Sequence, residues 1–105
     1  MVRGSITKKR LRITNKTTGQ PAADDIAEAL ELVLYSNANN TPVKRLAVDD
    51  GIQKEAPGVF VVTITAADSL LLPTKGRAYL MGYILPIKRS IKIDLGAITD
   101  NLANQ

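Results

Sequence analysis

Hydrophobic and polar residues alternate with a period of two along most of the chain, which predicts a protein built from β-strands. The clearest segment is residues 58–72, GVFVVTITAADSLLL, in which every residue from Val59 to Thr65 is β-branched or aromatic. After this central strand we expect a corner that turns Leu70–Leu72 under the sheet. The alternation predicts that one face of the strand is fully apolar and lies on the core, with Phe60, Val62 and Ile64.

Segments with similar alternation lie on both sides of the central strand, and Gly, Pro, Asn and Asp separate them. The Asn-rich stretch 37–42 predicts a long hairpin loop, and Asp49-Asp50-Gly51 predicts a tight hairpin turn. About seven short strands then predict an all-β fold, namely a single immunoglobulin-like antiparallel β-sandwich. The further strand segments are 5–14, 43–48, 52–55, 77–85 and 90–95.

Residues 22–36 fit the pattern of a helix and also that of a strand. Ile26 and the leucines after it recur at helical spacing, and the two aspartates before it suit a helix N-terminus. The same leucines occupy every second position, as they would in a strand. Because the neighbouring segments indicate strands, we favour a strand over 29–36, preceded by a loop or one short helical turn near residues 22–28.

The segment 77–85, RAYLMGYIL, is apolar on both faces, so it is either buried on both sides or carries an interaction surface. Gly82 within it indicates a bulge or a close backbone approach. One face is a Tyr-Met-Tyr stripe, which is most often core and next most often the contact face of an oligomer, where Tyr and Met are favoured. The candidate partner interface is Tyr79, Met81, Tyr83 and Leu85.

The length of 105 residues predicts one domain over residues 1–105, with mobile ends at 1–4 and 101–105. Aromatic residues make up only 4% of the chain, so the core must be aliphatic. The absence of Cys and His excludes disulfides, thiolate metal sites and Ser-His or Cys-His catalytic pairs. We find no signal peptide and no apolar run of the roughly 20 residues that span a bilayer, and therefore expect synthesis in the cytoplasm and no membrane partner.

The net charge of +4 comes from the start of the chain. Residues 1–16 hold six of the 14 basic residues and none of the 10 acidic ones, so the remaining 8 basic and 10 acidic residues leave a net charge of −2. The segment therefore suits a solvated edge strand, or else a face that binds phosphate or a partner. No aromatic residue lies within 20 positions for stacking on bases. The candidate basic contact face is Lys8, Lys9, Arg10 and Arg12.

Few side chains suggest catalysis or metal binding. Asp24-Asp25 and Asp49-Asp50 offer oxygen ligands for Ca²⁺ but lack the spacing of a calcium loop. Glu28 with Glu31 or with Asp25 is a conceivable carboxylate pair for glycoside hydrolysis, but only one tyrosine lies nearby as a sugar platform. No phosphate-binding glycine motif is present, and a Ser-Lys pair has no motif to support it. We expect no catalytic residue, no metal, no cofactor and no enzymatic activity.

Two short motifs frame the domain. Arg3-Gly4 leads into the first strand, and the central strand ends in Thr-x-x-Asp-Ser-x-x-Leu, before a final pair of strands closes the chain. This layout resembles the small immunoglobulin-like virion proteins of tailed bacteriophages and prophages, which decorate heads or build tails and baseplates. Ala66 and Ser69 stand where that family usually has Gln and Thr. The letters of the second motif are Thr65, Asp68, Ser69 and Leu72.

The resemblance implies a structural role, with assembly through sheet faces or edges. We therefore expect a non-enzymatic assembly protein that acts through protein–protein contacts, as a head decoration, tail or baseplate component of a phage virion. Its partners would be other copies of itself and other structural proteins. The alternative is a β-sandwich module that binds carbohydrate or a nucleic-acid backbone through the basic N-terminal strand.

Overall fold

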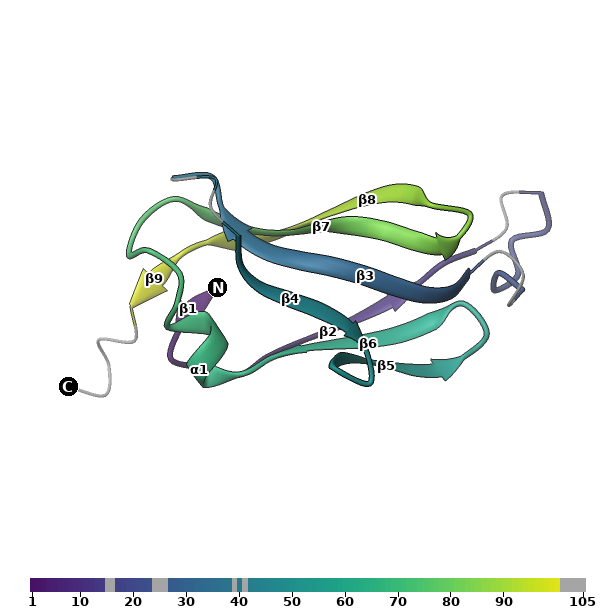
Figure 1. Cartoon of the computed structure of the whole chain (residues 1–105), viewed down its shortest axis with the longest axis horizontal. Coiled ribbons are helices and arrows are strands. Elements are labelled where there is room, and N and C mark those ends of the chain that lie inside the picture. Colours follow the sequence, from purple (N-terminus) through teal and green to yellow (C-terminus); the bar gives the residue numbers. More distant parts are fainter. Residues whose placement is uncertain (15–16, 24–26, 39, 41, 101–105) are drawn as a thin grey trace.

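The fold is that of a computed structural model, which describes residues 1–14, 17–23, 27–38, 40 and 42–100. Seven strands form one mixed sheet in the order β2-β6-β5-β4-β3-β7-β8, and β1 pairs in parallel with β9 (Figure 1). The elements are β1 (Val2–Arg3), β2 (Thr7–Arg12), β3 (Ala27–Ser36), β4 (Pro42–Val48), β5 (Gly51–Ala56), β6 (Val59–Ile64), α1 (Ala66–Ser69), β7 (Arg77–Pro86), β8 (Arg89–Ala97) and β9 (Thr99–Asp100).

The sheet curls into a half-barrel, with β2, β6 and β5 on one side of the core and β4, β3, β7 and β8 on the other (Figure 1). The predicted all-β class with about seven strands is confirmed. The two halves face each other over one core, as in a sandwich, but they belong to a single hydrogen-bonded sheet. The order of strands matches the immunoglobulin order, because β2, β6 and β5 take the places of strands B, E and D, and β4, β3, β7 and β8 take those of C′, C, F and G.

The predicted tight hairpin at Asp49-Asp50-Gly51 is wrong. β4 and β5 run parallel where they meet, over only two residue pairs. The backbone of Ala47 exchanges hydrogen bonds with that of Asp50, 3.0 and 2.9 Å long, so the chain turns a corner there and does not reverse. Gly51 has φ +93°, a backbone conformation that favours glycine, and a Cβ atom there would lie 2.4 Å from Leu46 Cδ2, so the Leu46 side chain would have to shift.

The central strand β6 is confirmed, since it lies between β2 and β5 with its predicted core face fully buried. Each such side chain contributes about 1.5–3 kcal/mol of hydrophobic free energy. The predicted corner is only partly right, because Leu72 is buried whereas Leu70 and Leu71 are 53% and 56% exposed. Helical and turn geometry after Thr65 points successive side chains in different directions, so only one of the three leucines reaches the core.

The preference for a strand over a helix in residues 29–36 is also confirmed, and β3 begins two residues earlier, at Ala27. Its leucines Leu30, Leu32 and Leu34 are 0% exposed. β3 pairs antiparallel with β4 on one side and β7 on the other, and this pairing selects the period-two pattern over the helical one. The helical turn expected near 22–28 lies partly outside the described residues, and positions 27 and 28 belong to β3.

The two motifs that carry the virion resemblance lie against each other. Arg3 donates from Nε to the Leu72 carbonyl (2.9 Å) and from Nη2 to the Leu70 carbonyl (3.2 Å). The Gly4 amide donates to Ser69 Oγ (2.8 Å), and this buried hydroxyl donates to the Ala66 carbonyl (2.9 Å). The start of the chain is thus fastened to the α1 corner, at the end of the molecule where β1 and β9 pair (Figure 1).

Residues 1–4, expected to be a mobile end, make further specific contacts. The backbone nitrogen of Met1 donates to the Ala97 carbonyl (2.7 Å), and Thr99 N donates to the Met1 carbonyl (3.0 Å). Thr65 caps α1 by accepting from the Asp68 amide (3.1 Å), so the hydroxyl side chains of Thr65 and Ser69 both stabilise this corner. The other predicted mobile end, residues 101–105, lies outside the described residues.

Gly82 stands where β7 comes closest to β3. It is opposite Leu32, and no register shift occurs at this pair, so the expected close approach applies and the bulge does not. A Cβ atom at Gly82 would lie 1.7 Å from the Glu31 carbonyl oxygen and 2.9 Å from Leu32 Cα. Backbone atoms cannot rotate away as a side chain can, so any side chain here forces two central strands apart.

Gly82→Ala is therefore expected to lower the free energy of unfolding by about 3 kcal/mol or more, through overpacking of a rigid neighbour. Gly19→Ala is the control, because its φ is +71° but nothing lies within 4 Å of the added Cβ. The control should lose only about 1–2 kcal/mol from backbone strain. Urea unfolding of both variants measures the difference, and equal losses would contradict the close approach.

Candidate functional site

The outer face of β7 is exposed and apolar. On the inner face Ala78, Leu80 and Ile84 are buried, whereas Met81 is 43% and Tyr83 50% exposed. The Tyr-Met-Tyr stripe therefore lies on the outside of the half-barrel, and the core alternative does not hold for it. Leu85, the last residue of the candidate interface, is half-buried towards the end of β7.

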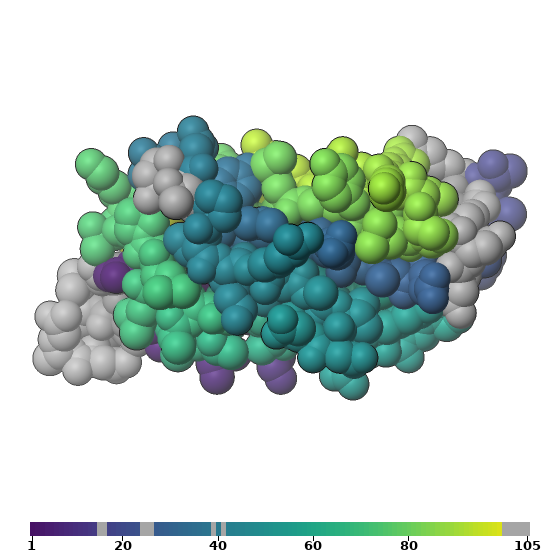
Figure 2. All heavy atoms as spheres, in the orientation of Figure 1, coloured from purple at the N-terminus to yellow at the C-terminus, as the bar shows by residue number. Residues whose placement is uncertain are grey.

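Strand register places the stripe within a larger surface. Residues directly opposite each other on neighbouring strands share a face, so the outer side chains of β4, β3, β7 and β8 form three rows. The rows are Ala47–Glu31–Tyr83–Ser90, Arg45–Val33–Met81–Lys92 and Pro42–Tyr35–Tyr79–Asp94. Figure 2 shows this face from outside, with β3 (blue) between β4 (teal) and the β7–β8 hairpin (green to yellow). We call these three rows the outer face.

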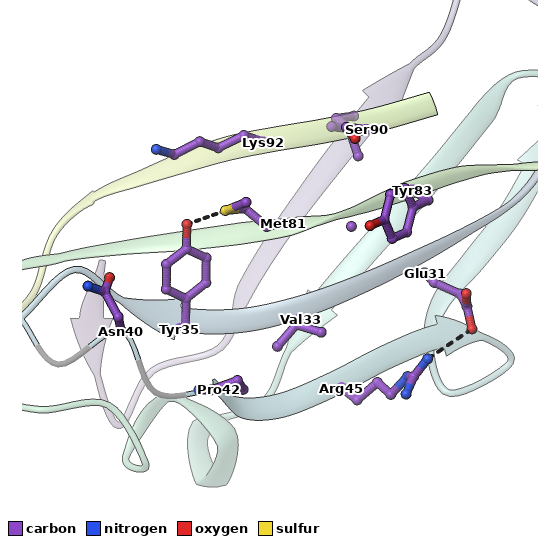
Figure 3. Close-up of a pocket in the computed structure, with 12 residues that line it drawn as sticks. Glu31, Val33, Tyr35, Asn40, Pro42, Arg45, Met81, Tyr83, Ser90 and Lys92 are labelled. Atoms are coloured by element: carbon purple, nitrogen blue, oxygen red, sulfur yellow. Dashed lines mark hydrogen bonds and ion pairs between the residues drawn. The ribbon is translucent and has the colours of Figure 1, made fainter. Parts of the chain in front are cut away.

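The outer face is hollowed along its middle. A cavity of about 560 Å³ lies over Val33 and Met81, with Tyr35 and Tyr83 beside them (Figure 3). Its volume falls within the roughly 300–1,000 Å³ of typical binding sites, and its lining is mostly apolar with a few polar groups. We call this cavity the outer hollow. It combines the size of a binding site with a mostly apolar lining.

Aromatic contacts order the floor of the outer hollow. The rings of Tyr35 and Tyr79 stack with centroids 5.5 Å apart at 29°. The Tyr35 hydroxyl contacts Met81 Sδ, as the dashed line in Figure 3 marks. Lys92 Nζ lies 4.4 Å from the centroid of the Tyr79 ring, at the distance of a cation–π interaction. These contacts hold the floor side chains in place before any partner arrives.

Charged groups lie around the floor and not within it. Arg45 pairs with Glu31 at 3.3 Å on one side, and Arg77 pairs with Asp94 at 3.0 Å near one end. The Gly96 amide, which donates to the carboxylate, and the Arg77 guanidinium both lower the pKa of Asp94 below its usual 3.8. The hydrogen bond to Asp94 raises the pKa of Arg77 in return. An apolar centre with a charged rim is the usual anatomy of a protein interface.

The predicted basic face is less concentrated than its sequence suggests. β2 is an edge strand, as expected, and Lys8, Lys9, Arg10 and Arg12 are all exposed. Alternation along β2 sends Lys9 to the opposite side from the other three. Arg10 pairs with Glu55 of β5 at 2.7 Å. These residues lie on the other half of the sheet from the outer hollow, so the structure does not bring the two candidate sites together.

The other candidate groups are dispersed. Asp49 and Asp50 are exposed at the β4–β5 corner, while Asp24-Asp25 lie outside the described residues. Glu28 is exposed and Glu31 is paired with Arg45. Across the described ranges, no three potential metal ligands lie together, and no helix has the length and apolar character of a membrane span.

The predicted interface included only β7, and it missed the contributions of β3 and β4. The alternation that buries the leucines of β3 also sends Glu31, Val33 and Tyr35 to the opposite face. That signal was present in the sequence, but only knowledge of the pairing of β3 with β7 places it beside Met81. No sequence pattern indicated Arg45 as part of the site, because the order of strands across the sheet is set by the tertiary fold.

Comparison with protein-family models finds no match, and neither curated proteins nor solved structures show a match to the chain.

The Asp94–Arg77 contact predicts a pH dependence. Because the folded-state pKa of Asp94 is lowered, its carboxylate stabilises the fold above the unfolded-state pKa of about 3.9, and this contribution is lost as the pH falls through the folded-state pKa. The urea midpoint of Asp94→Asn should therefore lie below that of the wild type near neutral pH, with the difference shrinking below about pH 4. Arg77→Gln should raise the pKa of Asp94, as followed by carboxyl-carbon NMR. An unchanged pKa in Arg77→Gln would contradict the assignment.

Proposed function

We propose that the protein is a non-enzymatic assembly component that contacts other proteins through its outer face. The observation that carries this proposal is the exposure of Met81 (43%) and Tyr83 (50%) at the centre of a sheet face. Burying such side chains in a contact removes apolar surface from water, which favours association. Tyr and Met are also among the residue types enriched at interfaces.

The architecture favours contact through side chains on this face. β3 and β7 are each paired on both sides within the sheet, so their backbone groups are already bonded. The ring stack and the Tyr35–Met81 contact hold floor side chains in place, which reduces the conformational entropy lost on binding. The outer face is thus a preorganised surface on a rigid part of the fold.

We further propose that the assembly is the virion of a tailed phage, as a head decoration, tail or baseplate component. The support is the resemblance of the two motifs together with their mutual contact. Arg3-Gly4 and the Asp68-Ser69 corner are far apart in the sequence, yet Arg3 and Gly4 bond directly to that corner. Residues that stabilise one another are expected to be retained together in a family of related folds.

Binding of a nucleic-acid or carbohydrate chain by β2 is a second candidate. It is favoured by the exposure of all four basic side chains on that strand. Their division between two sides of the strand, and the ion pair of Arg10, weaken it as a single contact face. A salt-sensitive gel shift that is lost on neutralising all four residues would favour this candidate over assembly.

In the assembly account, phage particles induced from the strain that carries the gene contain this chain at a fixed stoichiometry. Tyr83→Glu should lower its incorporation at least about tenfold, because a carboxylate would be desolvated in the contact. Gln53→Glu introduces the same charge at an exposed position on β5 and should be incorporated normally. Quantitative mass spectrometry of purified particles measures both.

Particles that contain the other structural proteins but lack the wild-type chain would contradict the virion proposal. Normal incorporation of Tyr83→Glu would remove the outer face as the contact surface.

A further inference from the structure

Two cations stand on opposite sides of the outer hollow. Arg45 of β4 and Lys92 of β8 belong to the same row, with Val33 and Met81 between them (Figure 3). Three strand spacings separate them, which is about 14 Å at about 4.8 Å each. An α-helix with its side chains is about 10–12 Å across. The spacing of the two backbone positions that carry these cations is thus slightly more than the width of one helix lying on the sheet, and the long side chains, with Lys92 over Tyr79 and Arg45 at Glu31, border that space.

Backbone hydrogen bonding favours a helix over an extended segment as the occupant. The backbone of β3 and β7 is paired on both sides, so the outer face offers side chains and no row of free backbone groups. An extended segment laid across this face would leave its own N–H and C=O groups without partners in the contact. A helix satisfies its backbone internally and presents only side chains.

Charge determines which helix fits. Among the described residues, two cations and one carboxylate line the hollow, and that carboxylate, Glu31, already pairs with Arg45. The pair is exposed, with side-chain exposures of 74% for Arg45 and 41% for Glu31, so it contributes little and leaves Arg45 able to meet a second carboxylate. A second copy of this face would bring its own two cations against these, and like charges across an interface are unfavourable.

We propose, building on the assembly function above, that the outer hollow binds an amphipathic α-helix of a different protein, with an apolar stripe flanked on both sides by acidic residues. The stripe lies on Val33 and Met81, and the acidic flanks face Arg45 and Lys92. The helix contacts the hollow along the three rows, over about 14 Å or two to three turns. This names the class of partner that the assembly function leaves open.

The test uses the full chain, labelled with ¹⁵N, and three capped synthetic peptides of about 20 residues, long enough to form helix. The first repeats leucines at helical spacing flanked by Glu. The second replaces each Glu by Lys, and the third is the acidic peptide with two central prolines. The acidic helix should bind and shift the amide signals of Val33, Met81 and their neighbours. The other two should bind at least tenfold more weakly.

Variants of the protein separate the effect of charge from non-specific hydrophobic binding. The double variant Arg45→Glu with Lys92→Glu should weaken the acidic helix at least tenfold and strengthen the basic one. The double variant Lys8→Glu with Arg12→Glu, which reverses two exposed charges on β2, is the matched control and should leave binding of the acidic helix unchanged. Equal binding of all three peptides, shifts confined to β2, β6 and β5, or no binding of the acidic helix would each overturn the inference.

Particle incorporation separates this inference from the proposed function. If the acidic helix fails to bind while Tyr83→Glu still blocks incorporation, the outer face remains the contact surface and the helical partner is wrong. If the acidic helix binds in the hollow while Tyr83→Glu is incorporated normally, the helix site stands and its role in assembly is wrong.

Discussion

The pairing of β3 on both sides, with β4 and with β7, is the constraint on which the structure depends. A strand held this way must send alternate side chains to opposite faces. Its leucines fill the core from one face, so Glu31, Val33 and Tyr35 are committed to the other. The same pairing requires glycine at position 82, because the backbones approach too closely there for a Cβ atom. The core and the outer hollow thus lie on opposite faces of the β3–β7 pair.

The remaining parts of the chain support this pair without taking part in the site. The first residues and the α1 corner fasten to each other at one end of the molecule. The β4–β5 corner carries the chain from one half of the sheet to the other and lets it curl round the core. The basic edge strand β2 closes the far side, where lysines and arginines discourage pairing with other sheets.

Local pattern predicted most of the strands, and tertiary pairing decided what the pattern could not. The period of two identified β6 and β3, and the stripe on β7, because one face of each of these strands is largely buried. Asp-Gly at the end of β4 indicated a hairpin, but β5 runs parallel to β4 where the two meet, so the segment is a corner. The sequence did not indicate that Arg45 and Lys92 border the same hollow. The two residues are 47 positions apart, and only the order of strands in the sheet places them in one row. Alternation along the sequence indicates which face of the sheet a side chain occupies. It does not indicate which residues lie beside that side chain on neighbouring strands.

Hydroxyl-radical footprinting of the chain, free in solution and within purified particles, tests the central claim most directly. If the outer face is the contact surface, Met81 and Tyr83 are oxidised readily in the free chain and are strongly protected in the particle. Leu70 and Leu71, equally exposed but at the α1 corner, provide an internal comparison. Equal oxidation of Met81 and Tyr83 in both states would contradict the account.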